Sequence, residues 1–219
     1  MIGGGSKLPA IIKAAKNPKS KFYISLVVSH KTDSAGVKLA IKNNIPAVYF
    51  KLPDYRNRIA GGKKSARADY MKLLGWFITQ REYNPKLLVF AGWSLVMDSN
   101  FFNFFKSAIG EGYCAINLHP AVMPLRNESQ KIRLPDGSLT PVIRGEQQEV
   151  LETVIEGKLT FFGPSIHFMV PTKYDTGTVI NREFIKVAKN DTVDSLRKKL
   201  MPVEDRLLVK AINFVVSKI

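Results

Sequence analysis

Two short segments of this chain carry side chains that could act together on a carbonyl group. Asn117 and His119 stand at the end of an apolar run, residues 113–117, that has the length of a strand. Because side chains alternate along a strand, both point to the same side of it. Asp175 lies further along the chain, in a turn before another expected strand. An amide that donates to an oxyanion, an imidazole that moves protons and a carboxylate that orients the imidazole form a suitable set for attack on a carbonyl.

Each of these motifs is ambiguous when taken alone. An Asn beside a His at a strand end is more often a cap or a surface pair than a catalytic pair, and the turn 175–177 alone is an ordinary turn. His167, in the segment 163–167 that opens another expected strand, has equally favoured chemical and structural interpretations. The order of the motifs and their positions at strand ends favour the catalytic interpretation.

Apolar runs of strand length alternate along the chain with longer segments of helical period. This alternation predicts an α/β fold of Rossmann-like type, with a mostly parallel sheet and helices on both faces. Ligands of such sheets bind beyond the carboxyl ends of the strands. We expect residues 1–219 to form one domain. The expected strands are residues 22–29, 47–52, 87–91, 113–117, 165–170 and 178–187, and the expected helices are residues 8–16, 34–43, 65–81, 99–108, 146–156 and 193–218.

The chain starts with a glycine-rich segment, residues 3–6, that leads into an expected helix with Ser6 as its N-cap. A loop of this kind offers backbone N–H groups and the positive end of a helix dipole to a phosphate. A strand usually precedes such a loop, and here only Met1 and Ile2 do. We therefore expect a truncated first strand, and on composition alone a mobile terminus is an equally good interpretation.

The charge balance favours anionic partners. The 219 residues include 33 Lys and Arg against 18 Asp and Glu, a net charge of +15. Such an excess suits phosphorylated or carboxylated small molecules, nucleic acid or a membrane surface. The basic residues are scattered and form no long tract, so we expect small-molecule substrates rather than nucleic acid.

Other features of the composition point away from several classes of protein. The longest apolar run is far shorter than the roughly 20 residues that span a bilayer, so no membrane partner is expected. Cys114 is the only cysteine and lies in an apolar run. We expect a buried, inert thiol, which fits a reducing compartment such as the cytoplasm. The three His and one Cys have no recognisable zinc spacing, so no metal is expected.

Taken together, the motifs resemble the central signatures of the folate-dependent formyltransferases. Within that family the chain is most similar to the branch that formylates glycinamide ribonucleotide. The central motifs are Asn117-Leu118-His119-Pro120-Ala121, Gly163-x-Ser165-x-His167-Phe168 and Asp175-x-Gly177. The likeness covers nearly the whole chain, and further matching segments are Gly3-Gly4-Gly5-Ser6-Lys7-Leu8, Ser29-His30-Lys31, Asn44-Ile45-Pro46, Ala66-Arg67-Ala68-Asp69-Tyr70, Leu88-Val89-Phe90-Ala91-Gly92-Trp93 and Val203-Glu204.

The resemblance implies direct formyl transfer in purine synthesis, with 10-formyltetrahydrofolate as the co-substrate. The amine of glycinamide ribonucleotide would attack the formyl carbon and form a tetrahedral intermediate. Asn117 and a charged His119 would stabilise its oxyanion. Asp175 would raise the pKa of His119 and help to relay protons, and His167 would support Asp175.

The resemblance also implies binding residues. The phosphate would be held by Gly5, Ser6 and Lys7, with Arg67 as a counter-charge, and the ribose hydroxyls would be held by Glu204. The folate would lie against Trp93, Ser94, Leu95, Val96 and Met97 and against the loop with Val170 and Tyr174. Without the resemblance, Arg67 and Glu204 would be interpreted as exposed helix charges, and core packing remains open for Trp93.

Three departures from the family pattern accompany these expectations. The first strand is reduced, Lys7 replaces a common Asn, and residues 125–139 replace a shorter segment. We expect the stretch 124–141 to be a long loop with turns. Two alternatives stay open: a hydrolase that deformylates the folate with the same three residues, and a non-catalytic binding protein on this fold.

Overall fold

The sheet at the centre of this computed structural model is mixed, with a mostly parallel core. The structure describes residues 1–52, 62–110, 112–125, 131–173 and 175–219. β1 (Val27–Ser29) pairs in parallel with β2 (Ala47–Tyr49), and a four-stranded sheet has the order β3-β4-β8-β9. In that sheet β3 (Leu88–Phe90) is parallel to β4 (Ala115–His119), whereas β8 (Ser165–Phe168) is antiparallel to both β4 and β9 (Val179–Arg182).

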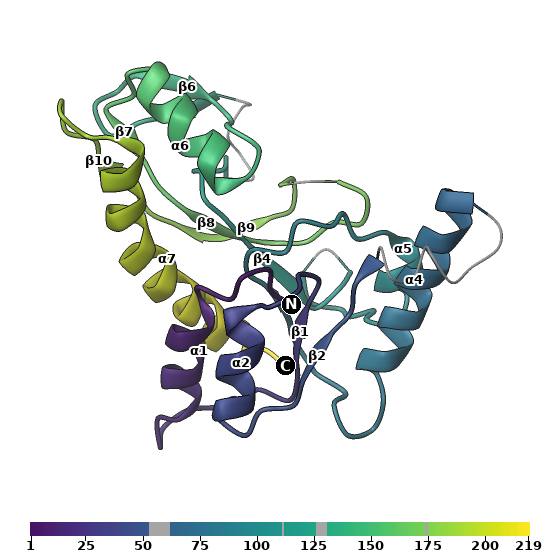
Figure 1. Cartoon of the computed structure of the whole chain (residues 1–219). Helices are drawn as coiled ribbons and strands as arrows, with labels where there is room; N and C mark the ends of the chain where they lie inside the picture. Colours follow the sequence, from purple (N-terminus) through teal and green to yellow (C-terminus); the bar gives the residue numbers. More distant parts are fainter. Residues whose placement is uncertain (53–61, 111, 126–130, 174) are drawn as a thin grey trace.

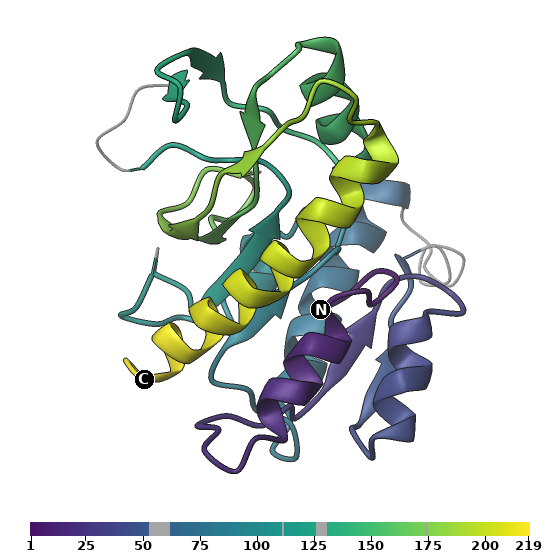
Figure 2. The same ribbon diagram turned by 90° about the vertical axis from the view of Figure 1, so that its left-hand side faces the viewer.

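Helices cover both faces of this sheet, as the sequence predicts (Figure 1). On one face, α4 and α5 pack on β1 and β3 in one apolar cluster. On the other, α1 and α7 pack together, and Figure 2 shows α7 lying across the sheet. The helices are α1 (Leu8–Ala15), α2 (Ala35–Lys42), α4 (Gly62–Ile78), α5 (Ser99–Phe102), α6 (Gln147–Glu156) and α7 (Val193–Val216).

Neighbouring residues of β4 explain why helices are needed on both sides. Ala115 belongs to the cluster with α4 and α5, and Ile116 to the cluster with α1 and α7. Because successive side chains of a strand point to opposite faces, an apolar run must be covered twice. The predicted α/β class is therefore confirmed, and the antiparallel pair β8–β9 is added at the edge of the parallel core.

The first strand is reduced to a single rung between β1 and β3. Ile2 forms parallel bridges to both Ser29 and Ala91, and the Met1 amino group donates to the Val89 carbonyl at 2.9 Å. Towards the amino ends of β1 and β3 lies a mostly apolar cavity of about 460 Å³, lined by the backbone segments around Leu26 and Leu87. The cavity thus adjoins the place where Ile2 joins β1 and β3.

The stretch 124–141, expected to be a loop, contains a β-hairpin. β5 (Lys131–Arg133) and β6 (Leu139–Pro141) pair in antiparallel fashion. Ile132 is buried while its two neighbours are exposed, which is the alternation of a half-buried strand. The prediction failed because each strand is only three residues long, although Gly137 in the turn, with φ +87°, is a hairpin signal.

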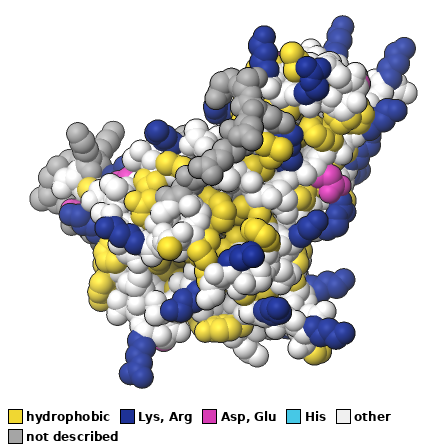
Figure 3. Space-filling model, turned by 180° about the vertical axis from the view of Figure 1, so that it is seen from behind, with side chains coloured by type: hydrophobic (Ala, Val, Ile, Leu, Met, Phe, Trp, Pro, Cys, Tyr) yellow, Lys and Arg dark blue, Asp and Glu magenta, His cyan; other side chains and the backbone are white. Residues whose placement is uncertain are grey.

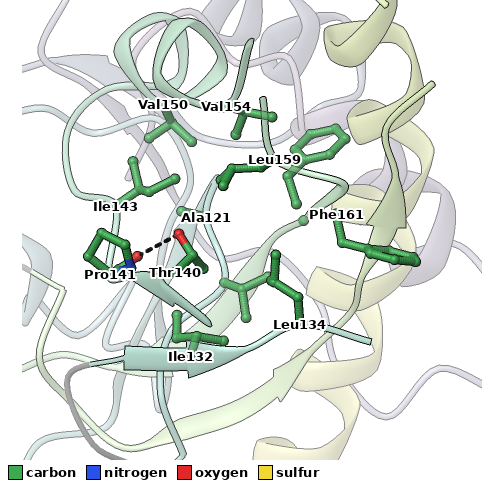
Figure 4. A pocket seen from close by; sticks show the side chains of 13 residues that line it. Ala121, Ile132, Leu134, Thr140, Pro141, Ile143, Val150, Val154, Leu159 and Phe161 are labelled. Carbon is green, nitrogen blue, oxygen red and sulfur yellow. Dashed lines mark hydrogen bonds between the residues drawn. The ribbon is translucent and has the colours of Figure 1, made fainter. Parts of the chain in front are cut away.

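This hairpin packs on α6 through apolar side chains. Ile132 and Leu134 face Val150 and Val154 across a gap of about 20 Å³ (Figure 4). A space of that size holds about one water molecule, so it is a packing gap rather than a ligand site. A second short pair of antiparallel strands, β7 (Phe161–Phe162) with β10 (Ile185–Lys186), lies next to this gap.

Two further expectations concern the surface and the thiol. Lys and Arg side chains are dispersed over the face seen in Figure 3, with no continuous tract. Cys114 is buried, and burial raises the pKa of its thiol, as expected of an inert cysteine. Within the ranges that the structure describes, no helix is both long and apolar enough to cross a membrane.

Candidate active site

Asn117, His119 and Asp175 meet at the carboxyl end of β4. Asn117 Nδ2 lies 3.4 Å from Asp175 Oδ1, and His119 Nδ1 lies 3.3 Å from Asp175 Oδ2. The two strand residues therefore point to the same side of β4, as their spacing predicts, and one carboxylate contacts both. His119 is 2% exposed, and the Asp175 side chain is 10% exposed. The arrangement combines an amide donor, an imidazole and a carboxylate in a site largely shielded from water.

His167 reaches the same carboxylate from β8. Asn117 and His167 are direct cross-strand partners, and His167 Nε2 lies 3.2 Å from Asn117 Nδ2 and 3.5 Å from Asp175 Oδ1. Its Nδ1 carries a hydrogen, because the Phe168 carbonyl at 2.8 Å can only accept. A bulge in the β8–β9 register falls between Ile166 and His167, and bulges of this kind re-aim side chains.

The hydrogen-bond partners of His119 determine which of its ring nitrogens carries a hydrogen. Nε2 lies 2.9 Å from the Ile143 carbonyl oxygen, which only accepts, so Nε2 carries a hydrogen. The neutral ring then presents its Nδ1 lone pair to Asp175, and this is the nitrogen that gains the second proton. The ring is thus oriented at one side by a backbone carbonyl and at the other by a carboxylate.

Asp175 raises the pKa of His119, as the resemblance implies, but burial lowers this pKa by more. Burial lowers the pKa of His119 below its ordinary value, and the charge of Asp175 and the bond to Ile143 raise it by less. For Asp175, burial raises the pKa, but contact with His167 and the charges of His119 and Arg144 together hold that pKa below its ordinary value. In the unliganded protein, the arrangement therefore favours a neutral imidazole beside an ionised carboxylate.

The backbone around Asp175 is shaped by a close contact between two segments. Asp175 has φ +46°, in the left-handed region that non-glycine residues seldom occupy. A Cβ on Gly177 would lie 1.7 Å from the Phe168 carbonyl oxygen, so only glycine fits there. This contact holds the Asp175 turn against β8 and explains the Asp-x-Gly spacing physically.

The glycine-rich loop packs tightly on the start of α2. Gly5 has φ +90°, and a Cβ on it would lie 2.4 Å from Gly36 Cα. Ser6 is exposed and does not cap the helix as expected, because the N-cap position is taken by Lys7, without a side-chain hydrogen bond. The loop nevertheless places exposed backbone at the amino end of α1, where an anion is favoured.

Two of the residues expected to contact the ribonucleotide are engaged with each other. Lys7 Nζ lies 2.7 Å from Glu204 Oε2, and both residues are buried. Arg67 donates to the Val96 carbonyl at 2.7 Å. The interpretation of Glu204 as an exposed helix charge is wrong, and the ammonium of Lys7 points to α7 rather than standing free for a phosphate.

The two segments expected to hold the folate lie side by side. The Met97 carbonyl accepts from the Thr172 amide at 2.9 Å, which joins the segment 93–97 to the loop after β8. Val170 begins this loop and bridges to Lys173, and Tyr174 lies outside the described residues. Trp93 packs edge-on against His30 at 4.5 Å between ring centroids and against the core cluster, so core packing accounts for much of its surface. Ser94 is exposed, and Leu95 and Val96 are half-buried.

Sequence reasoning missed two contributors to this site. The Ile143 carbonyl orients His119, and the exposed charge of Arg144 lowers the pKa of both His119 and Asp175. A backbone carbonyl leaves no trace in residue types, so no local signal could identify Ile143. Within the described ranges, no cluster of His, Cys, Asp and Glu could hold a metal ion.

Comparison with known families agrees with this α/β fold and its polar strand-end site. The family model described as Formyl transferase matches residues 1–212, so the chain belongs to that family.

Similar curated proteins bear more specific names. The phosphoribosylglycinamide formyltransferase of Schizosaccharomyces pombe is 26% identical over 218 residues, which are 98% of this chain and 94% of that protein. The enzyme of the same name from Dictyostelium discoideum is 27% identical over 220 residues, covering 99% and 95%. The chain spans less than two thirds of other relatives: 18% of the bovine trifunctional purine biosynthetic protein adenosine-3 and 62% of the chloroplastic phosphoribosylglycinamide formyltransferase of Arabidopsis thaliana.

Among solved structures, glycinamide ribonucleotide transformylase 1 from Symbiobacterium toebii aligns with a TM-score of 0.76. It is 19% identical, and the alignment covers 100% of this chain and 85% of that one. At that identity the likeness concerns the fold.

Proposed function

We propose that this chain transfers a formyl group from 10-formyltetrahydrofolate to the amine of glycinamide ribonucleotide, in the cytoplasm, as a single domain. The observation that carries the proposal is the contact of both Asn117 and His119 with the carboxylate of Asp175. Curated relatives that the chain covers almost fully bear the name of this activity.

In the proposed reaction, the substrate amine attacks the formyl carbon and a carbon–nitrogen bond forms. The carbonyl electron pair moves to oxygen, Asn117 Nδ2 donates a hydrogen bond to that oxyanion, and the positive charge of the protonated His119 ring stabilises it. The amine loses a proton, and the folate nitrogen gains one as its bond to the formyl carbon breaks. Asp175, next to His119, accepts and returns this proton through the ring.

A charged His119 fits this scheme if its second proton arrives as negative charge develops. Burial keeps the ring neutral in the unliganded protein, and Asp175 lies where the proton is needed. An oxyanion adds a further negative charge beside the ring and so favours the imidazolium form.

For the ribonucleotide, we propose that the phosphate binds the backbone and hydroxyl of Gly5 and Ser6 at the amino end of α1. For the folate, we propose the adjoining surfaces of the segment 93–97 and of residues 170–173. In this scheme Arg67 contributes indirectly, because its bond to the Val96 carbonyl supports the first of these surfaces.

The test mixes the purified protein with 10-formyltetrahydrofolate and follows the absorbance of the folate product, with and without glycinamide ribonucleotide. Turnover that requires the amine supports the transferase. Turnover without the amine identifies a hydrolase instead, and no turnover by a folded protein identifies a non-catalytic binding protein. Either of the last two results overturns the proposal.

A further inference from the structure

Glu204 is held by two partners of different kinds in the middle of α7. Lys7 Nζ lies 2.7 Å from Oε2, while Gln147 Nε2 lies 3.2 Å from Oε1 and 3.4 Å from Oε2. The Glu204 side chain is 2% exposed. A carboxylate so buried needs a counter-charge, and Lys7 supplies it.

The ammonium group of Lys7 contacts three residues of α7. Besides Glu204, its ammonium lies 3.2 Å from Asp205 Oδ1 and 3.4 Å from the Met201 carbonyl oxygen. Two carboxylates and one carbonyl of the same helix therefore surround the ammonium group. Lys7 therefore joins the glycine-rich loop to α7 and holds the Glu204 carboxylate in place.

Gln147 is bound much less firmly. It is half-buried at the first position of α6, and one nitrogen is shared between both carboxylate oxygens at long distances. Two vicinal hydroxyls would offer one O–H to each oxygen, at the shorter distances typical of bonds to a charged acceptor. The Gln147 amide thus occupies the place on Glu204 that a diol would fill better.

We propose that Gln147 masks Glu204 in the unliganded protein, that the ribose hydroxyls of the amine substrate displace its amide, and that Lys7 positions the carboxylate from behind. This inference rests on the proposed function. It assigns Lys7 to ribose recognition through Glu204, and not to direct contact with the phosphate.

The test measures dissociation constants by calorimetry for glycinamide ribonucleotide, for the riboside that lacks the phosphate, and for the 2′,3′-dideoxy form of that riboside. Gln147→Ala removes the competing amide, so it tightens binding of both diol ligands by about threefold, the low end of the value of a hydrogen bond because both Gln147 contacts are long. Binding of the dideoxy ligand stays unchanged. Gln148→Ala, an exposed neighbour on the same helix, is the matched control. Weaker binding of the diol ligands by Gln147→Ala overturns the masking role.

Lys7→Met leaves Glu204 without its counter-charge. It weakens binding of ribonucleotide and riboside by the same factor, roughly tenfold for a charge-assisted bond. Lys13→Met, on the exposed side of α1, is the control and changes neither. If Lys7→Met weakens the ribonucleotide alone, Lys7 is a phosphate ligand and the positioning role is overturned. Circular dichroism establishes that the variant is folded, and Lys7→Asn provides a second, smaller replacement.

Binding to the wild-type protein distinguishes failure of the proposed function from failure of the inference about Gln147 and Lys7. If the wild-type protein binds neither ribonucleotide nor riboside, the proposed function fails, and the inference fails with it. If it binds both while the variants depart from the pattern above, only the inference fails.

Discussion

His119 Nδ1 faces Asp175 Oδ2 at 3.3 Å, although each residue comes from a different strand end and neither is exposed by more than a tenth of its side-chain surface. Burial acts on the two groups in the same sense, since it disfavours the charged form of each. The pKa of the carboxyl group nevertheless lies below its ordinary value, because the contact with His167 and the charge of Arg144 favour its ionised form. In the unliganded protein, the neutral His119 ring can therefore accept a proton at Nδ1, next to the ionised Asp175.

Replacing Asn117 by Ala removes the amide that contacts Asp175 and His167 and that we propose as the oxyanion donor. We expect kcat for formyl transfer to fall by about 100-fold or more, which is typical of losing one oxyanion donor. Steady-state assays with both substrates measure this effect. Asn213→Ala, on the exposed face of α7, is the matched control and keeps kcat. A kcat for Asn117→Ala within twofold of wild type would exclude oxyanion stabilisation by Asn117.

Replacing Asp175 by Asn removes the charge that raises the pKa of His119, while burial continues to lower it. We expect kcat to fall by about 100-fold. A transition state that needs the imidazolium also loses that form at lower pH, so the alkaline limb of the pH profile should move to lower pH. Assays between pH 5 and 9 check both effects, and Asp194→Asn, at an exposed position of α7, is the control. An unshifted alkaline limb would contradict coupling between Asp175 and His119.

Stability should depend on pH through the amino group of Met1. Burial lowers the pKa of this amino group from 8.0 to about 5 in the folded protein. The unfolded chain therefore binds a proton between these values and the folded one does not, so stability is lost as pH falls from 8 to 5. The difference corresponds to roughly 4 kcal/mol. Urea unfolding at several pH values measures it.

Two variants with added residues before Met1 distinguish the effect of the Met1 charge on stability from the effect of the neighbouring apolar cavity. An added Gly/Ser segment before Met1 turns the ammonium into a peptide amide and should remove most of this pH dependence. An added segment of Val and Ile should also raise the unfolding temperature, because it can pair between β1 and β3 and fill the apolar cavity. Equal unfolding temperatures for the two extensions would mean that the cavity does not accept a strand.

Replacing Gly177 by Ala places a methyl group 1.7 Å from the Phe168 carbonyl oxygen. Backbone must move to relieve this contact, so we expect a loss of about 3 kcal/mol and a fall in unfolding temperature of roughly 6–12 °C. Asp175 moves with the turn, and kcat falls as well. Gly4→Ala, where a Cβ would meet nothing within 4 Å, is the control for stability. Unchanged thermal unfolding of Gly177→Ala would refute the close approach.

The sequence predicted the order of most helices and strands, and it singled out Asn117, His119 and Asp175, which the structure brings into contact. A helix lies within or over each of the six expected helical ranges, although the expected helix 99–108 is reduced to α5 at residues 99–102. The expected core strands correspond to β1, β2, β3, β4, β8 and β9, although the expected strand 22–29 is strand only at residues 27–29. These features are local, because the period of apolar residues along a short segment indicates a strand or a helix. The same-side placement of Asn117 and His119 followed from strand period, and the place of Asp175 opposite them was an inference from resemblance.

The tertiary structure decided what depends on distant partners. The pairing of Lys7 with Glu204 joins the first turn of the chain to its last helix, and the orientation of His119 depends on the Ile143 carbonyl beyond the hairpin. The net pKa of His119 reflects a balance between burial and charge that residue types do not express. Such contacts and desolvation energies arise only after the chain has folded, so they are properties of the assembled site rather than of any segment of the sequence.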